Sequence, residues 1–310
     1  MSGCVSSAAL LQGGVGYLGT FVEAPGWLLF VACLAALSGL AAWGVTQSVG
    51  TAAALSVVEI GGLLLVIGSA PDSPVDMVAR IAEAAPPFDV AAVASISAAA
   101  LLAFFAFIGF EDMVNVAEEV IDPRSVFPKA IGLTLAITAL LYMGVSVVAV
   151  TSVPLDTLAQ SDAPLATLFE HLTGWGTGVL SAIAIVAVLN GVLIQLVMAT
   201  RILYGLSRQG QLPAQLGRVS AVTHTPLAAT ALVTVVILAF GLSLPLAHLA
   251  EITSVVTLSS FALVNLSLWR LKRTRPQPID VFAVPQWVPL AGFATSGLFL
   301  VLELGRRLFG

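Results

Sequence analysis

The chain has 310 residues, of which 58% are hydrophobic and only 9% are charged, and its mean hydropathy is +1.03. Soluble domains carry about 25% charged residues, so this composition excludes a soluble surface and predicts an integral membrane protein. The net charge is −5, and no basic patch of the kind that binds nucleic acid is present in the sequence. Cys4 and Cys33 both lie in apolar runs, which favours small core residues over a disulfide or a metal site.

Nine apolar stretches are long enough to cross a bilayer, which takes about 20 residues in a helix. None of them alternates over about 10 residues as a strand of a membrane β-barrel does. The sequence therefore predicts an all-α integral membrane protein with a single membrane domain over 1–310. The expected spans are 3–22, 27–44, 51–70, 90–110, 128–151, 175–204, 226–245, 249–270 and 287–304.

Lys and Arg gather in every second connection, and the positive-inside rule places those connections in the cytoplasm. The basic connections are 122–129, 205–225 and 270–286. The alternate connection 151–176 has no Lys or Arg. Nine spans then put the N-terminus inside and the C-terminus outside, which leaves Arg306 and Arg307 as external exceptions to the rule.

Glu59 lies near the centre of an expected span and has no basic residue near it in the sequence. A charged side chain at the bilayer centre costs about 2.5–3.5 kcal/mol on insertion scales. Two interpretations stay open, namely a site for a proton or another cation, and a neutral acid that bonds to a neighbouring helix. Asn190 and Gln195, in a later span, are expected to bond between helices rather than to touch a substrate.

The stretch FFAFIGFE at 104–111 joins a run of bulky apolar residues to an acidic segment. As one plain span followed by an amphipathic helix, its acidic residues would only form a solvated face. Those residues are Glu111, Asp112, Glu118 and Glu119, and Asp122-Pro123 would end the helix. The alternative is a helix that breaks inside the membrane at Gly109, because Gly tolerates backbone conformations outside the helix. Such a break is tolerated only where it lines a cavity, as in the midplane sites of secondary transporters.

Four segments resemble the amino acid–polyamine–organocation (APC) superfamily of permeases, in the family's order and with similar spacing. FAFIGFEDMVNVAEEVIDPRSVFPKAI (105–131) resembles helix six, RILYGLSRQGQLP (201–213) the loop after helix eight, 249–273 helix ten, and VPQWVPLAGF (284–293) the start of helix eleven. The resemblance implies a five-plus-five inverted-repeat fold, in which broken helices one and six hold the substrate between them.

On this resemblance the nine spans correspond to family helices three to eleven. Residues 1–70 would be a remnant of the first repeat (helices three to five), 90–271 the second repeat (helices six to ten), and 287–310 a peripheral helix eleven. The chain is thus expected to be N-terminally truncated, without the first two helices and without the last. That expectation accounts for the abrupt apolar start and for the two external arginines.

The resemblance also implies a substrate site. The substrate's amino group would lie near backbone carbonyls of helix six, at the break. The residues concerned are Phe105, Ala106, Phe107, Ile108 and Gly109. Phe105 aligns with an aromatic residue that packs over the substrate, although a single Phe in such a span commonly just packs in the core or faces lipid.

Two acidic residues are expected to serve gating or coupling. Glu111 lies just past the break, where a carboxylate could sense closure or could only cap a helix over 111–121, which is worth about 0.3–1 kcal/mol. Glu59 stands where some proton-coupled relatives carry a Lys that occupies a cation site.

The expected function is that of a secondary active transporter, a permease that moves an amino acid or a related amine across the plasma membrane. Coupling to protons, to sodium or to exchange stays open, and so does the alternative of a non-transporting remnant or a partner-dependent membrane subunit. No P-loop (GxxxxGK[ST]) occurs in the sequence, so transport driven by ATP is not expected. No cluster of metal-ligating residues occurs in the sequence either, and no enzyme activity, cofactor or metal is expected. The expected partners are a small-molecule substrate, the lipid bilayer and a coupling proton or sodium ion, with no nucleic acid.

Overall fold

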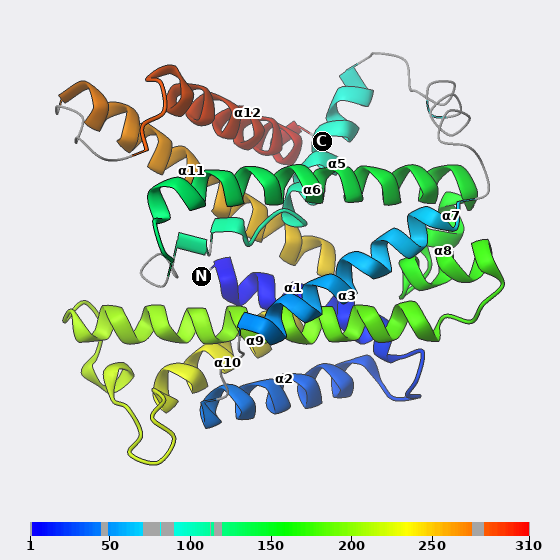
Figure 1. Cartoon of the computed structure of the whole chain (residues 1–310), viewed down its shortest axis with the longest axis horizontal. Coiled ribbons are helices and arrows are strands. Elements are labelled where there is room, and N and C mark those ends of the chain that lie inside the picture. The colour runs from blue at the N-terminus through cyan, green and yellow to red at the C-terminus, as the bar shows by residue number, and fades with distance from the viewer. Residues whose placement is uncertain are drawn as a thin grey trace. The chain divides into compact units, whose positions relative to one another are not determined.

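The computed structural model describes residues 2–44, 49–70, 81, 90–111, 113–114, 120–274 and 282–309 (Figure 1). Within these ranges the chain forms helices and connecting turns and contains no strand, which confirms the all-α fold. The expectations for Asp112, Glu118 and Glu119, and for most of the connections 69–89 and 275–286, concern positions outside the described residues.

Nine helices in the described ranges overlap the nine stretches expected to span the membrane. They are α1 (Ser2–Leu18), α2 (Gly26–Trp43), α3 (Val49–Gly68), α5 (Val90–Phe105), α6 (Pro123–Ser152), α9 (Gly178–Arg208), α10 (Leu227–Ser243), α11 (Leu246–Thr274) and α12 (Trp287–Phe309). The shorter elements are α7 (Leu155–Ala159), α8 (Pro164–Thr173) and the 3-10 helix η2 (Ala214–Gly217). By length and hydropathy, five of these described helices can cross a membrane, namely α2, α6, α9, α11 and α12. The apolar stretches of α3, α5 and α10 are shorter than those of these five helices.

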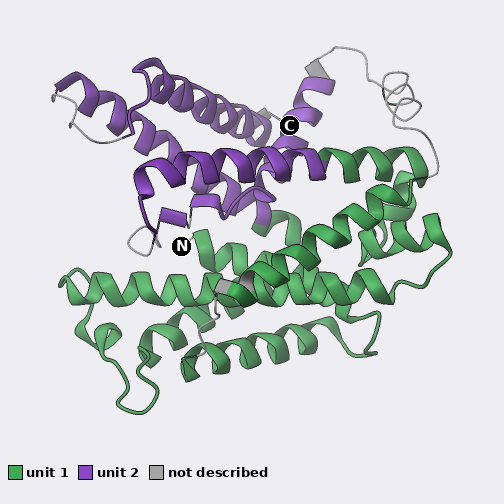
Figure 2. Ribbon diagram, viewed as in Figure 1, with its two compact units in different colours: residues 1–84, 143–249 green, residues 85–142, 250–310 purple. Residues whose placement is uncertain are grey.

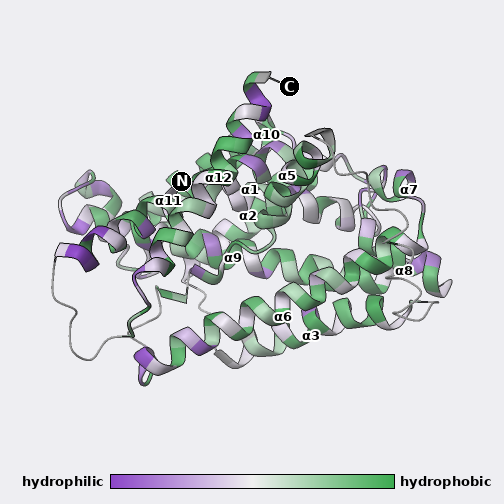
Figure 3. Ribbon diagram, turned by 90° about the horizontal axis from the view of Figure 1, so that it is seen from above, coloured by the Kyte–Doolittle hydropathy of each residue, from purple (hydrophilic) through white to green (hydrophobic). Residues whose placement is uncertain are grey.

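Apolar residues run along the full length of many helices, and hydrophilic residues gather mainly at helix ends and in connections (Figure 3). Large apolar side chains are exposed on several helices, for example Leu140 of α6 at 67% and Leu263 of α11 at 65%. Water-soluble proteins rarely expose so much contiguous apolar surface, whereas lipid is a favourable environment for it. The chain is therefore a multi-pass membrane protein.

The described chain divides into two compact units (Figure 2). Unit 1 comprises 1–84 and 143–249, and unit 2 comprises 85–142 and 250–310. Each unit draws on two separate parts of the sequence, so these units are not the two sequence repeats expected at 1–70 and 90–271. The repeat boundaries remain a prediction.

In unit 1, α1 packs mainly along α9 and also contacts α10 and α2. Ser7 Oγ donates to Gln195 Oε1 at 3.0 Å, and Gln195 Nε2 donates to Ser6 Oγ at 3.1 Å. The expected role of Gln195 in bonding between helices is thereby confirmed. Gln12 Nε2 of α1 donates at 2.8 Å to the carbonyl of Leu244, just past the end of α10, where helical carbonyls lack intrahelical partners.

Candidate functional site

In unit 2, the helix expected over 90–110 ends before Gly109, close to the predicted break. α5 ends at Phe105, inside the span expected over 90–110, and 106–109 form a turn. The N–H groups of residues 106–108 each donate to the carbonyl three residues earlier at 3.0–3.2 Å, which tightens the last turn in the 3-10 manner. The α-helical hydrogen-bond ladder therefore lapses where the substrate site was expected.

Gly109 has φ +128°, a backbone conformation that side chains with a Cβ rarely adopt. A Cβ built on Gly109 would have no heavy atom within 4 Å, so the backbone angle and not lack of space requires glycine here. Glu111 Oε2 accepts a hydrogen bond from the Gly109 N–H at 2.8 Å. The Glu111 carboxylate thus stabilises the turn at Gly109 through this hydrogen bond.

The expectation of a helix over 111–121 is wrong for its described residues. Residues 110–111 and 113–114 form a 3-10 turn, 120–122 form a bend, and the next helix begins at Pro123. Proline favours the first turn of a helix, because its φ is already helical and its missing N–H is not needed there. Pro123 therefore begins α6 and does not merely end a preceding helix, and Asp122 before it takes φ +53°.

Aromatic rings from two other segments hold both ends of the break. Phe104 and Phe110, on either side of the turn, both contact Phe261 of α11, with ring centroids 6.2 and 5.8 Å apart. Phe107, within the turn, packs edge-on against Tyr142 of α6 at 5.3 Å. Such ring pairs contribute about 0.5–1.5 kcal/mol beyond their buried area, so α6 and α11 fix the position of the turn.

The carbonyls expected to face a substrate differ in their present partners. The Phe105 carbonyl accepts from the Ile108 N–H at 3.2 Å, and the Ala106 carbonyl accepts from the Tyr142 hydroxyl at 3.1 Å. A carbonyl oxygen has two lone pairs and can accept a second donor. Chemically, the turn can therefore offer acceptors to a cationic amine while its own hydrogen bonds stay formed.

Glu59 and Asn190 lie near each other in unit 1, on α3 and α9. The Asn190 side chain is within hydrogen-bonding reach of the Glu59 carboxyl. Glu59 Oε1 and Asn190 Oδ1 are both buried, and neither has a hydrogen-bond partner among the described residues. Buried acceptors without a donor are costly, by about 1–3 kcal/mol each. The contact joins α3 to α9, and it leaves both interpretations of Glu59 open, namely a site for a proton or another cation and an acid that bonds to a neighbouring helix.

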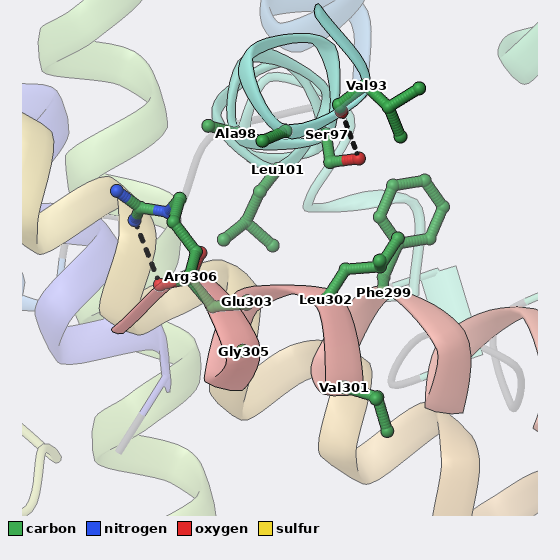
Figure 4. Close-up of a pocket in the computed structure, with 11 residues that line it drawn as sticks. Val93, Ser97, Ala98, Leu101, Phe299, Val301, Leu302, Glu303, Gly305 and Arg306 are labelled. Carbon is green, nitrogen blue, oxygen red and sulfur yellow. Dashed lines mark hydrogen bonds and ion pairs between the residues drawn. The ribbon is translucent and has the colours of Figure 1, made fainter. Parts of the chain in front are cut away.

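A groove of about 530 Å³ lies between α5 and α12 in unit 2 (Figure 4). Its lining is apolar apart from Ser97, Glu303 and Arg306. The hydroxyl of Ser97 donates to the Val93 carbonyl at 2.7 Å, and Arg306 Nε donates to Glu303 Oε2 at 3.0 Å. The polar groups that line the groove thus bond to protein neighbours, which makes it a poor site for a zwitterionic substrate.

Arg306 and Arg307, the exceptions to the positive-inside rule, belong to a cluster with Glu251 and Glu303. Arg307 Nε donates to Glu303 Oε1 at 2.5 Å and its Nη2 lies 3.1 Å from Glu251 Oε2, and Arg306 also pairs with both carboxylates. The Glu303 side chain is only 6% exposed. Each arginine therefore meets two carboxylates, and the cluster carries no net charge.

No group of three or more His, Cys, Asp or Glu side chains that could hold a metal ion occurs in the described ranges. Cys4 and Cys33 are free thiols.

Sequence reasoning missed three contributors to these sites, namely Tyr142, Phe261 and the pairing of Asn190 with Glu59. Tyr142 could have been noticed in the sequence, because it is the only aromatic residue with a hydroxyl in the span 128–151. Nothing in the sequence singles out Phe261, since a Phe in an apolar helix usually only packs.

These features define a multi-pass α-helical membrane protein in which α5 ends in a turn that contains a glycine with a non-helical φ. The chain matches the amino acid permease family over residues 1–304 and belongs to it, which confirms the resemblance to the APC superfamily. The members to which it is similar are transporters.

It is 30% identical over 221 residues to the branched-chain amino acid permease BcaP of Bacillus subtilis (71% of this chain, 48% of the relative). It is 32% identical over 192 residues to the vacuolar cationic amino acid transporter 4 of Arabidopsis thaliana (62% and 32%). It is 28% identical over 214 residues to the methylthioribose transporter of Bacillus subtilis (69% and 46%). The chain thus spans about half, or less, of the length of the curated relatives it matches.

Proposed function

We propose that this chain acts as a secondary active transporter that moves an amino acid or a related amine across the plasma membrane, and that it has no enzyme activity. The observation that carries this proposal is the break at 106–109, where α-helical hydrogen bonding lapses at the end of the apolar helix α5 and inside the span expected over 90–110. Non-helical backbone at membrane depth is tolerated only where it is buried in protein or lines a water-filled cavity. The substrate-binding residues are Phe105, Ala106, Phe107, Ile108 and Gly109.

Relatives are named for branched-chain amino acids, cationic amino acids and methylthioribose. The first two classes carry a primary ammonium group, which suits the carbonyl acceptors of the turn. We therefore propose an amino acid with an apolar or a cationic side chain as the substrate class.

Glu111 and Glu59 take the gating and coupling roles in this proposal. The bond between the Glu111 carboxylate and the Gly109 N–H links the charge of Glu111 to the shape of the turn. Glu59 with Asn190 offers two buried oxygens without donors, which suits a coupling proton or a sodium ion.

The test is uptake by the purified full chain in liposomes, with L-leucine and L-arginine as labelled probes and with imposed pH and sodium gradients. Saturable uptake of one of them, blocked by the unlabelled L-enantiomer and not by the D-enantiomer, is expected. Absence of uptake in liposomes, with the protein folded and inserted, would favour a non-transporting remnant or a partner-dependent subunit instead.

A further inference from the structure

The Tyr142 hydroxyl of α6 lies beside the Ala106 carbonyl, one of the carbonyls proposed to face the substrate. It donates to that carbonyl at 3.1 Å across 36 residues of sequence. Its ring is set against the Phe107 ring, with centroids 5.3 Å apart and planes at 68°. A hydrogen bond and a ring contact to adjacent residues of the turn together fix where the hydroxyl oxygen lies.

The hydroxyl oxygen of Tyr142 and the carbonyl oxygen of Ala106 are close enough for one nitrogen donor to bind both. A nitrogen donor prefers about 2.9 Å to each acceptor, and with oxygens 3.1 Å apart such a nitrogen completes a nearly equilateral triangle. A phenol oxygen both donates and accepts, and a carbonyl oxygen has two lone pairs. Donation to the carbonyl also polarises the hydroxyl, which strengthens its oxygen as an acceptor. Ala106 is exposed, so side chains of the described residues do not enclose this pair.

We propose that Tyr142 is a substrate-binding residue, and that its hydroxyl oxygen and the Ala106 carbonyl together bind a primary ammonium group of the substrate. This inference rests on the proposed transport function and narrows its substrate to amines that carry N–H donors. A quaternary ammonium keeps the positive charge but has no N–H to donate, so it gains nothing from the pair of oxygens.

The experiment compares equilibrium binding of two probes to the purified full chain. The probes are whichever of L-leucine and L-arginine binds the unmodified protein more tightly, and the Nα,Nα,Nα-trimethyl derivative of the same amino acid. Tyr142→Phe keeps the ring and removes the hydroxyl, and Tyr204→Phe on α9 is the matched control. Because a hydrogen bond to a charged group is worth roughly a tenfold factor or more, Tyr142→Phe should bind the amino acid at least about tenfold more weakly. Its affinity for the trimethyl derivative should stay within about twofold.

A second variant separates hydrogen bonding from packing. Tyr142→Leu removes the ring contact to Phe107 as well as the hydroxyl, so it should lose the preference for the primary amine as Tyr142→Phe does, and it should also bind the trimethyl derivative more weakly than Tyr142→Phe does. If Tyr142→Phe weakens both probes equally, Tyr142 acts by packing and the inference is wrong while the transport function stands. If neither amino acid binds the unmodified protein, the proposed function fails and this inference fails with it.

Discussion

Replacing Gly109 with Ala tests whether the break at 106–109 is needed for function. The φ of +128° at Gly109 lies outside the regions that residues with a Cβ populate. No heavy atom lies within 4 Å of a Cβ built there, so the whole penalty is backbone strain and none is steric overlap with neighbours. Residues held in such conformations cost about 1–3 kcal/mol.

The chain offers a matched control for this change. Gly174, after α8 in unit 1, also has a positive φ, +70°, and no heavy atom within 4 Å of a Cβ. Ala at Gly174 should cost about 1–2 kcal/mol, a comparable loss of stability at a site remote in sequence from the break. Both variants should therefore unfold at lower temperature than the unmodified protein, as measured by thermal melting in detergent.

Gly109→Ala and Gly174→Ala should differ in their uptake of the substrate. At Gly109 the turn can relieve the strain by moving, which displaces the carbonyls on either side, and 1–3 kcal/mol corresponds to about 5–150-fold in an equilibrium. We expect at least about tenfold lower uptake of the preferred amino acid by Gly109→Ala in liposomes, and uptake within about twofold of normal by Gly174→Ala. Normal uptake by Gly109→Ala would show that the conformation of the turn is not required, and the break would lose its place as the substrate site.

Two further predictions concern unit 1. Glu59→Gln should make uptake independent of an imposed pH gradient, because an amide cannot carry a proton. The control Glu23→Gln lies in an exposed connection and should leave that dependence intact. If uptake by Glu59→Gln still responds to the pH gradient as the unmodified protein does, Glu59 has no role in coupling. Gly62→Ala should lower the melting temperature, because its Cβ would lie 2.9 Å from Ile183 Cγ2, whereas Gly61→Ala meets open space and should not. Ile183→Ala should lower the melting temperature less in the Gly62→Ala background than in the unmodified protein, and an equal effect in both would mean that the contact between α3 and α9 is not what Gly62 protects.

The positions of the helices could be predicted from the sequence because apolar length alone carries that signal. Each expected span overlaps a helix of the structure, and Gly109, the glycine between bulky aromatics, has a non-helical φ just after the end of α5. The sequence could not predict whether Pro123 ends one helix or begins the next. A proline both restricts the residue before it and favours the helix that follows it, and the sequence does not say which effect prevails.

Side-chain partners were the part that sequence could not supply. Tyr142 meets Ala106, and Asn190 meets Glu59, across long sequence separations that are closed only by tertiary packing. An isolated Tyr or Asn in an apolar helix is compatible with any neighbour. Only the register of one helix against another decides which polar group finds which partner, and close approaches such as that of Gly62 to Ile183 set this register.

The cluster of Arg306 and Arg307 with Glu251 and Glu303 offers a physical reason why these two arginines depart from the positive-inside rule on the expected topology. The positive-inside rule counts Lys and Arg because unpaired cations resist transfer to the outer side. Here both guanidiniums bond to two carboxylates, one of them almost fully buried, so the end of α12 presents no net charge. We expect two arginines in such a cluster to carry little weight in setting orientation, so the predicted placement of this end outside stays compatible with the other basic connections.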